Sequence, residues 1–195
     1  MEFRELRIPG SWEVTPRQFS DDRGVFLEWF KQETFTSTTG QRFELEQANW
    51  SVSSEGALRG IHFADVPPGQ AKYVTCVRGA ILDVVVDVRV GSPTFGQWDS
   101  VLLDDTAKRA VFIDVGLGHA FYALDEKATV LYLCTSGYNP KAEHGINPLD
   151  RDIGIEWPHI GHTGRRLDPI LSDKDAAAPT LKEAQEQGLL PTFRG

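Results

Sequence analysis

Three side chains that can move or hold protons occur close together in the sequence. His62 lies in the segment Arg59-Gly60-Ile61-His62-Phe63, and Lys72 follows the turn Pro67-Pro68-Gly69. In an extended strand His62 faces away from its neighbours and from Arg59, so its direction is fixed. A histidine with Arg59 and Lys72 around one cavity resembles a site that binds an anion or stabilises an enolate. The alternative is a hydrogen-bonded histidine at the edge of a core, the commoner role of a single histidine.

The spacing by which many small β-barrels hold a metal ion is missing. Those barrels use a His-x-His pair, and here the second position is occupied by Ala64. The other histidines show no His-Glu-x-x-His spacing; they are His119, His144, His159 and His162. We therefore expect no bound metal.

Two further residues have both a structural and a functional interpretation. The Gly-rich segment 115–121 is either a tight turn between strands or a device that presents His119 at the mouth of a cavity. It is not a dinucleotide fingerprint, since no strand–helix unit surrounds it. In an extended strand, Tyr132 faces the side opposite to that of its neighbours Leu131 and Leu133. It either packs in a core or, if it faces His62, donates a proton to an enolate.

Short strands separated by Gly and Pro have to position these residues. In the stretch from Lys72 to Arg89, two β-branched runs flank Arg78-Gly79, which predicts a tight turn between antiparallel strands. Asp83, Asp87 and Arg89 fall on the parity opposite Val84, Val86 and Val88. This partial alternation predicts one buried face and one face that is polar or lines a cavity. Further strands are expected over Gly24–Trp29, Leu45–Ser53, Ala57–Phe63, Gln97–Leu103, Ala110–Ile113 and Val130–Thr135. Many short strands at this spacing predict a sandwich, jelly roll or barrel.

Helices are few. A short helix is expected over Lys31–Thr39, ended by Gly40. A second is expected over Thr180–Gln187, because Thr180 and Glu183 form a capping box and Gly188 is a typical end. We expect the stretch from Asp150 to Pro169 to wrap around the barrel.

Size and charge limit the function. A chain of 195 residues with an ordinary apolar content fits one domain. Its net charge of -8 argues against a nucleic-acid partner. The charged start of the chain is unlike a signal peptide, and no apolar run reaches the ~20 residues of a membrane span. We expect a cytosolic protein with no membrane partner, in which Cys76 and Cys134 are small buried hydrophobes.

Several motifs, in collinear order along nearly the whole chain, resemble the dTDP-4-dehydrorhamnose 3,5-epimerase family. They are Asp22-Arg23-Gly24-Val25-Phe26, Gln47-Ala48-Asn49, Leu58-Arg59-Gly60-Ile61-His62-Phe63, Ala71-Lys72-Tyr73-Val74, Gly91-Ser92-Pro93-Thr94-Phe95-Gly96, Gly118-His119-Ala120-Phe121, Tyr138-Asn139-Pro140 and Leu171-Ser172-Asp173-Lys174-Asp175.

The resemblance implies an all-β, cupin-like antiparallel jelly-roll barrel with short peripheral helices and a C-terminal helix. We expect a single domain with an N-terminal arm (about 1–45), a barrel core (about 45–140) and a C-terminal wrap and helix (about 141–195). It also implies a homodimer with shared active sites, a dTDP-4-keto-6-deoxyhexose substrate, and no metal or organic cofactor.

The resemblance further implies roles for individual residues. His62 matches the general base, Asp175 the carboxylate that orients it, Lys72 the lysine near the enolate oxygen, and Tyr132 the acid on the opposite face. Arg23 and Glu28 match contacts lent by the neighbouring subunit. The remaining implied ligand contacts are Phe26 near the base, Tyr138 near the sugar, and Gln47, Asn49, Arg59, His119, Glu143 and Lys174.

The presence of Tyr132, Tyr138 and His119 favours inversion at both C3 and C5 over the single inversion made by some relatives on the same scaffold. Two other classes stay as alternatives. A metal-dependent cupin oxygenase is disfavoured by Ala64, and a non-catalytic binding module would leave the pairing of His62 with Asp175 unexplained.

Overall fold

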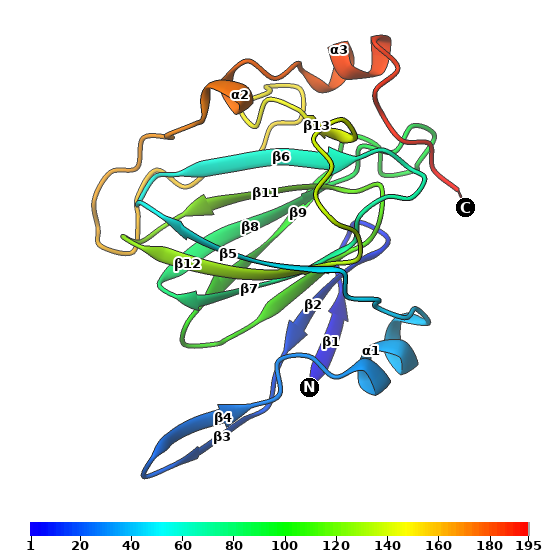
Figure 1. Cartoon of the computed structure of the whole chain (residues 1–195). Helices are drawn as coiled ribbons and strands as arrows, with labels where there is room; N and C mark the ends of the chain where they lie inside the picture. Colours follow the sequence, from blue (N-terminus) through cyan, green and yellow to red (C-terminus); the bar gives the residue numbers. More distant parts are fainter. Residues whose placement is uncertain (195) are drawn as a thin grey trace.

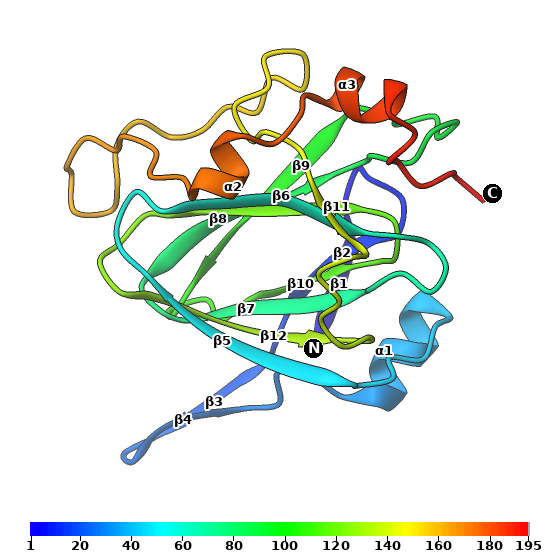
Figure 2. The ribbon, with the colours of Figure 1, turned by 45° about the horizontal axis from the view of Figure 1, so that its top comes forward.

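Two antiparallel sheets face each other in the computed structural model, which describes residues 1–194 (Figures 1 and 2). One sheet has the order β1 (Glu2–Glu5), β2 (Ser11–Thr15), β10 (Ala110–Ile113), β7 (Lys72–Arg78), β12 (Ala128–Cys134) and β5 (Gln47–Ser53). The other has the order β13 (Glu143–Gly145), β6 (Leu58–Ala64), β11 (Gly118–Ala123), β8 (Ala80–Val86) and β9 (Trp98–Asp104). The predicted all-β architecture is confirmed.

The main core fills the space between the two sheets. Val74 and Val130 point inward from the six-stranded sheet and meet Ile81, Val85 and Leu103 of the five-stranded sheet. Alternate residues of each strand enter this layer, as the two-residue period of a strand requires. The apolar core occupies one part of the layer, and a polar cavity occupies another.

The expected hairpin over Lys72–Arg89 is wrong. The chain does turn at Gly79, which has φ +71°. However, β7 pairs with β10 and β12, whereas β8 pairs with β11 and β9 in the facing sheet. The turn therefore carries the chain from one sheet to the other. Local sequence specifies the two strands and the glycine turn, but a strand's sheet is decided by partners far away in the sequence.

The N-terminal arm extends the fold. The strands β3 (Gln18–Asp21) and β4 (Gly24–Leu27) form a hairpin that projects from the body of the molecule (Figures 1 and 2). Helix α1 (Gln32–Thr39) follows and ends at Gly40, which has φ +73°, as predicted. The expected strand at Gly24–Trp29 is confirmed as far as Leu27.

The C-terminal segment crosses the outer side of the five-stranded sheet before α2 (Asp173–Ala176) and α3 (Leu181–Glu186). Thr180 and Glu183 form the predicted capping box of α3. Helix α2 is too short for its periodicity to show in the sequence. Within residues 1–194, no helix has the length and apolar character needed to cross a membrane.

Five strands were not predicted from the sequence: β1, β2, β3, β11 and β13. Strand β11 matters most, because its residues were interpreted as part of a Gly-rich turn. The turn is confined to residues around Gly116, which has φ +81°, and the strand begins at Gly118. His119 therefore projects from a central strand, which fixes its direction more firmly than a loop would.

Candidate active site

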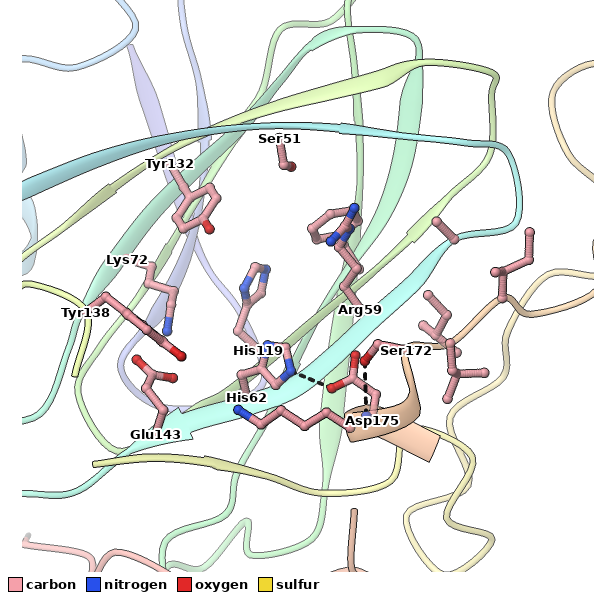
Figure 3. A pocket seen from close by; sticks show the side chains of 16 residues that line it. Ser51, Arg59, His62, Lys72, His119, Tyr132, Tyr138, Glu143, Ser172 and Asp175 are labelled. Carbon is pink, nitrogen blue, oxygen red and sulfur yellow. Dashed lines mark hydrogen bonds and ion pairs between the residues drawn. The ribbon is translucent and has the colours of Figure 1, made fainter. Parts of the chain in front are cut away.

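A cavity of about 460 Å³ opens between the two sheets (Figure 3). Nine of the residues singled out from the sequence line it, and they come from both sheets, from α2 and from the loop that holds Tyr138. They are Arg59, His62, Lys72, His119, Tyr132, Tyr138, Glu143, Lys174 and Asp175.

A histidine–carboxylate pair forms one wall of the cavity. The His62 Nε2 atom on β6 lies 2.7 Å from Oδ1 of Asp175 on α2 (Figure 3). Ser172 caps α2 and accepts a hydrogen bond from the Asp175 backbone N–H, which fixes the position of the carboxylate. Burial favours a raised pKa for Asp175, but hydrogen bonds from His62, Ser172 and the Gly60 backbone outweigh it and lower that pKa. The pair is therefore built around an ionised Asp175, which holds the ring with Nε2 protonated.

A bulge in β6 turns two residues of that strand toward the cavity. His62 pairs with His119, and Arg59 pairs with Phe121, so three steps on β6 match two steps on β11. Strict alternation predicts Arg59 and His62 on opposite faces. The extra residue corrects that prediction, because it brings both side chains to the same face.

Gly60 makes this bulge possible. It has φ +108°, and a Cβ atom there would lie 2.4 Å from the carbonyl oxygen of His119. Any other residue would push β6 and β11 apart.

Lys72 and Tyr132 form the wall opposite His62, on the adjacent strands β7 and β12 (Figure 3). Burial lowers the pKa of Lys72, and this is only partly opposed by the charge of Glu143. Burial raises the pKa of Tyr132 above its ordinary value. Tyr132 is therefore a phenol, with a proton to give, throughout the neutral range.

A second histidine–carboxylate pair lies beside the first. His119 Nε2 on β11 is 2.8 Å from Oδ2 of Asp83 on β8, and Asp83 is fully buried. Sequence reasoning placed Asp83 on a polar or cavity-lining face but did not pair it with His119.

Five predicted site residues do not line this cavity. Arg23, Phe26 and Glu28 lie on or beside the projecting N-terminal hairpin. Gln47 and Asn49 lie next to the cavity and bond to each other at 2.7 Å. Gln47 Oε1 also accepts the backbone N–H of Tyr138, so this pair supports the loop that brings Tyr138 to the cavity.

Several lining residues were missed by sequence reasoning. Ser51 shares the inward face of β5 with Gln47 and Asn49, so alternation alone could have found it. Its hydroxyl is buried and has no hydrogen-bond partner within residues 1–194. The other missed lining residues are Ala57, Leu58, Phe121, Ile170, Leu171 and Ser172.

The side chains in this site suit proton transfer. Across the described part of the chain, no three His, Cys, Asp or Glu side chains gather into a group able to hold a metal ion. The cavity instead combines a carboxylate-bound imidazole, an ammonium, a phenol and the cations Arg59 and Lys174. Such a set can take a proton, stabilise an oxyanion, return a proton and bind an anion.

Comparison with known proteins agrees with this chemistry. The family model described as dTDP-4-dehydrorhamnose 3,5-epimerase matches residues 5–183. A protein of that name from Mycolicibacterium smegmatis is 58% identical over 193 residues, which cover 99% of this chain and 92% of the relative.

Solved structures superpose over nearly the whole chain. An epimerase from Mycobacterium tuberculosis has a TM-score of 0.94 and 50% identity, with 99% of this chain and 94% of the other covered. A 3'-monoepimerase from Streptomyces bikiniensis, solved with dTDP-quinovose, has a TM-score of 0.90 and 53% identity, with coverages of 96% and 91%. The predicted cupin-like fold is confirmed, and the chain belongs to the dTDP-4-dehydrorhamnose 3,5-epimerase family, whose members are isomerases.

Proposed function

We propose that this enzyme inverts C3 and C5 of a dTDP-4-keto-6-deoxyhexose during deoxysugar biosynthesis. The observation that carries the proposal is the 2.7 Å contact between His62 and Asp175, at a cavity whose opposite wall holds Lys72 and Tyr132. The relatives named as 3,5-epimerases support the reaction, and the bound dTDP-quinovose of the Streptomyces bikiniensis protein supports the ligand class.

His62 is the proposed base. A hydrogen on a carbon next to a ketone is weakly acidic, and a positioned base speeds its removal by typically 10²–10⁴-fold. Nε2 is bonded to Asp175, and no described residue hydrogen-bonds to the other nitrogen, Nδ1, which is the atom proposed to accept the substrate proton. Asp175 then stabilises the imidazolium that forms.

Lys72 is the proposed stabiliser of the enolate. Proton removal at C3 or C5 places negative charge on the same C4 oxygen, so one cationic donor serves both centres. Lys72 is buried, and the charge of a buried donor is weakly screened.

Tyr132 is the proposed acid. Inversion requires the new proton to arrive on the face opposite the one that His62 deprotonated. The two residues lie on facing sheets, with the cavity between them. The resulting tyrosinate is reprotonated from solvent or by transfer through the site before the next turnover.

Arg59 and Lys174 are the proposed contacts of the diphosphate. Arg59 is held by a bond from its Nε to Ser53 Oγ, which leaves the two terminal nitrogens for phosphate oxygens. Gln47, Asn49, His119, Tyr138 and Glu143 are the remaining proposed contacts of the nucleotide sugar within one subunit.

The projecting hairpin supports a homodimer with shared sites. Phe26 on β4 is 68% exposed, and at the tip Arg23 makes an ion pair only with Asp21 within the described chain. The outer face of the six-stranded sheet also exposes Trp50 and Val52. We propose that this apolar face meets a second copy, and that Arg23, Phe26 and Glu28 then reach the partner's cavity.

Hybrid dimers test the sharing. Arg23→Ala and His62→Ala proteins should each be inactive alone and regain partial activity after subunit exchange, because one of the two sites in the hybrid is intact. Absence of activity in hybrids whose formation has been demonstrated would contradict shared sites.

Proton NMR of the dTDP-4-keto sugar in D₂O tests the reaction. We expect solvent deuterium at both C3 and C5 together with inverted product at both centres. Exchange and inversion at one centre alone would identify a mono-epimerase, the activity named for the Streptomyces bikiniensis relative.

We also expect catalysis without a metal ion. Treatment with a strong chelator, with removal checked by elemental analysis, should leave turnover unchanged. Activity that disappears and returns only with a divalent cation would contradict this prediction. The cytosolic location stays a prediction from the sequence.

A further inference from the structure

Asp83 is a charged residue placed within the apolar layer between the two sheets. It lies in the middle of β8, where it pairs in register with Phe121 and Val101. Ile81 and Val85, which share its strand parity, belong to the main hydrophobic core. A carboxylate costs free energy in such surroundings unless it is bonded.

The bonding of Asp83 is incomplete. Its Oδ2 atom contacts His119 Nε2, whereas its Oδ1 atom is buried and has no hydrogen-bond partner among residues 1–194. A residue kept only for stability would be better replaced by an apolar side chain of similar size. The placement of Asp83 therefore indicates a role that depends on its contact with His119.

His119 has one ring nitrogen committed and one available. Nε2 is bonded to Asp83, and no described residue hydrogen-bonds to Nδ1. The ring lines the same cavity as His62, its direct partner across β11 and β6. Because Asp83 accepts from Nε2, the neutral ring carries its proton there and offers the lone pair of Nδ1.

We propose that Asp83 is a positioning residue, which fixes the tautomer and direction of His119 so that Nδ1 accepts a hydrogen bond from a hydroxyl of the hexose. This rests on the proposed function for the identity of the ligand. Asp83 itself is not among the residues that line the cavity. It acts on the reaction by holding the sugar at an angle from which His62 and Tyr132 reach its two faces.

Asp83→Asn tests the proposal, since it keeps the size and removes the carboxylate. We expect kcat to fall by about tenfold, the worth of one misplaced hydrogen bond, with a smaller change in KM. The thermal midpoint should fall by less than about 4 °C, because a buried charge is removed along with the bond. A purely structural Asp83 would give the opposite result, a large loss of Tm and an unchanged kcat per folded molecule.

Nitrogen NMR of the resting enzyme supplies a readout that needs no substrate. Because Asp83 bonds to Nε2, His119 should carry a proton on Nε2 in the wild type and lose this preference in Asp83→Asn. The His119 signals are assigned by their absence in His119→Gln. A wild-type His119 protonated on Nδ1 would overturn the proposal, whatever reaction the enzyme catalyses.

His119→Gln keeps the proposal testable if Asp83→Asn does not fold. The Gln amide can still donate to Asp83, but it presents no equivalent of Nδ1 to the cavity. We expect a folded protein with a similar, about tenfold, loss of kcat. Wild-type kcat in this variant would overturn the role of Nδ1.

Discussion

Two histidine–carboxylate pairs stand side by side in the cavity wall, and they are built differently. His62 and His119 are direct partners on β6 and β11. The side chain of His62 is 36% exposed, whereas that of His119 is 11% exposed. Asp175 arrives on a short helix from the C-terminal segment, and Asp83 comes from within the sheet.

The two carboxylates also differ in their support. Asp175 bonds with His62, Ser172 and the backbone of Gly60, and these contacts lower its pKa. Among residues 1–194, Asp83 bonds only with His119, and its second oxygen has no hydrogen-bond partner. A partly exposed imidazole beside a well-stabilised carboxylate suits a base that gains and loses a proton in every turnover. A buried imidazole with a single bond suits a fixed contact.

The largest difference between the pairs should appear when each histidine is removed. His62→Ala should lower turnover by about 10²–10⁴-fold, the range of a general base. His119→Ala should cost less, on the order of tenfold, since it removes one contact and not the proton acceptor. Circular dichroism and thermal melting provide the control for folding. Equal losses of turnover in the two folded variants would contradict the assignment of His62 as the base and of His119 as a substrate contact.

Lys72→Met should have opposite effects on activity and stability. Loss of the enolate stabiliser should lower kcat by about 10²–10³-fold. Burial lowers the pKa of Lys72 in the folded state, so its ammonium destabilises the fold at neutral pH, and this cost is relieved as pH rises toward the unfolded value. The variant should therefore need more urea to unfold at pH 7. A lower urea midpoint would show that the ammonium stabilises the wall opposite His62.

Local patterns predicted much of the framework but little of the pairing. Alternation located β10 and most of β5, β6, β9 and β12, and the cap at Thr180 was correct. Nothing local places β7 and β8 in different sheets, because that depends on distant partners.

Contacts within the site were also not predictable from local sequence patterns. His62 and Asp175 are 113 residues apart, and their pairing was expected only from the family resemblance. The bulge that turns Arg59 toward the cavity depends on the register between β6 and β11, which a single sequence does not display. The contact between Asp83 and His119 was not predicted for the same reason, because it depends on the register between β8 and β11.

Tyr132→Phe should separate proton removal from inversion. It deletes only the hydroxyl, so the nucleotide should still bind and His62 should still take the proton. We expect deuterium at one or both centres of the recovered substrate, with product formation lowered by about 10²-fold. The matched control is Tyr73→Phe, whose hydroxyl bonds the Trp29 backbone outside the cavity. Inversion of both centres at the wild-type rate would show that another group is the acid.

The smallest effect concerns the stability that each carboxylate contributes. The pKa of Asp175 is lower in the folded state than its ordinary value near 3.9. Its ionised form therefore stabilises the fold above that value, and the contribution is lost as pH falls through the lower, folded-state pKa. Asp175→Asn should reduce the free energy of unfolding at pH 7 by about 1.5–3 kcal/mol, the typical contribution of a hydrogen bond to a charged group.

Urea unfolding of wild type, Asp175→Asn and Asp83→Asn across acidic and neutral pH measures this difference directly. The gap between wild type and Asp175→Asn should shrink as the pH falls below 4, because the wild-type carboxylate then takes up its proton. Asp83→Asn should lie closer to wild type at neutral pH, since the substitution also relieves a buried, half-bonded charge. A larger stability loss in Asp83→Asn than in Asp175→Asn would reverse the comparison. Asp83 would then be the structural carboxylate, and Asp175 would be kept for its action on His62 alone.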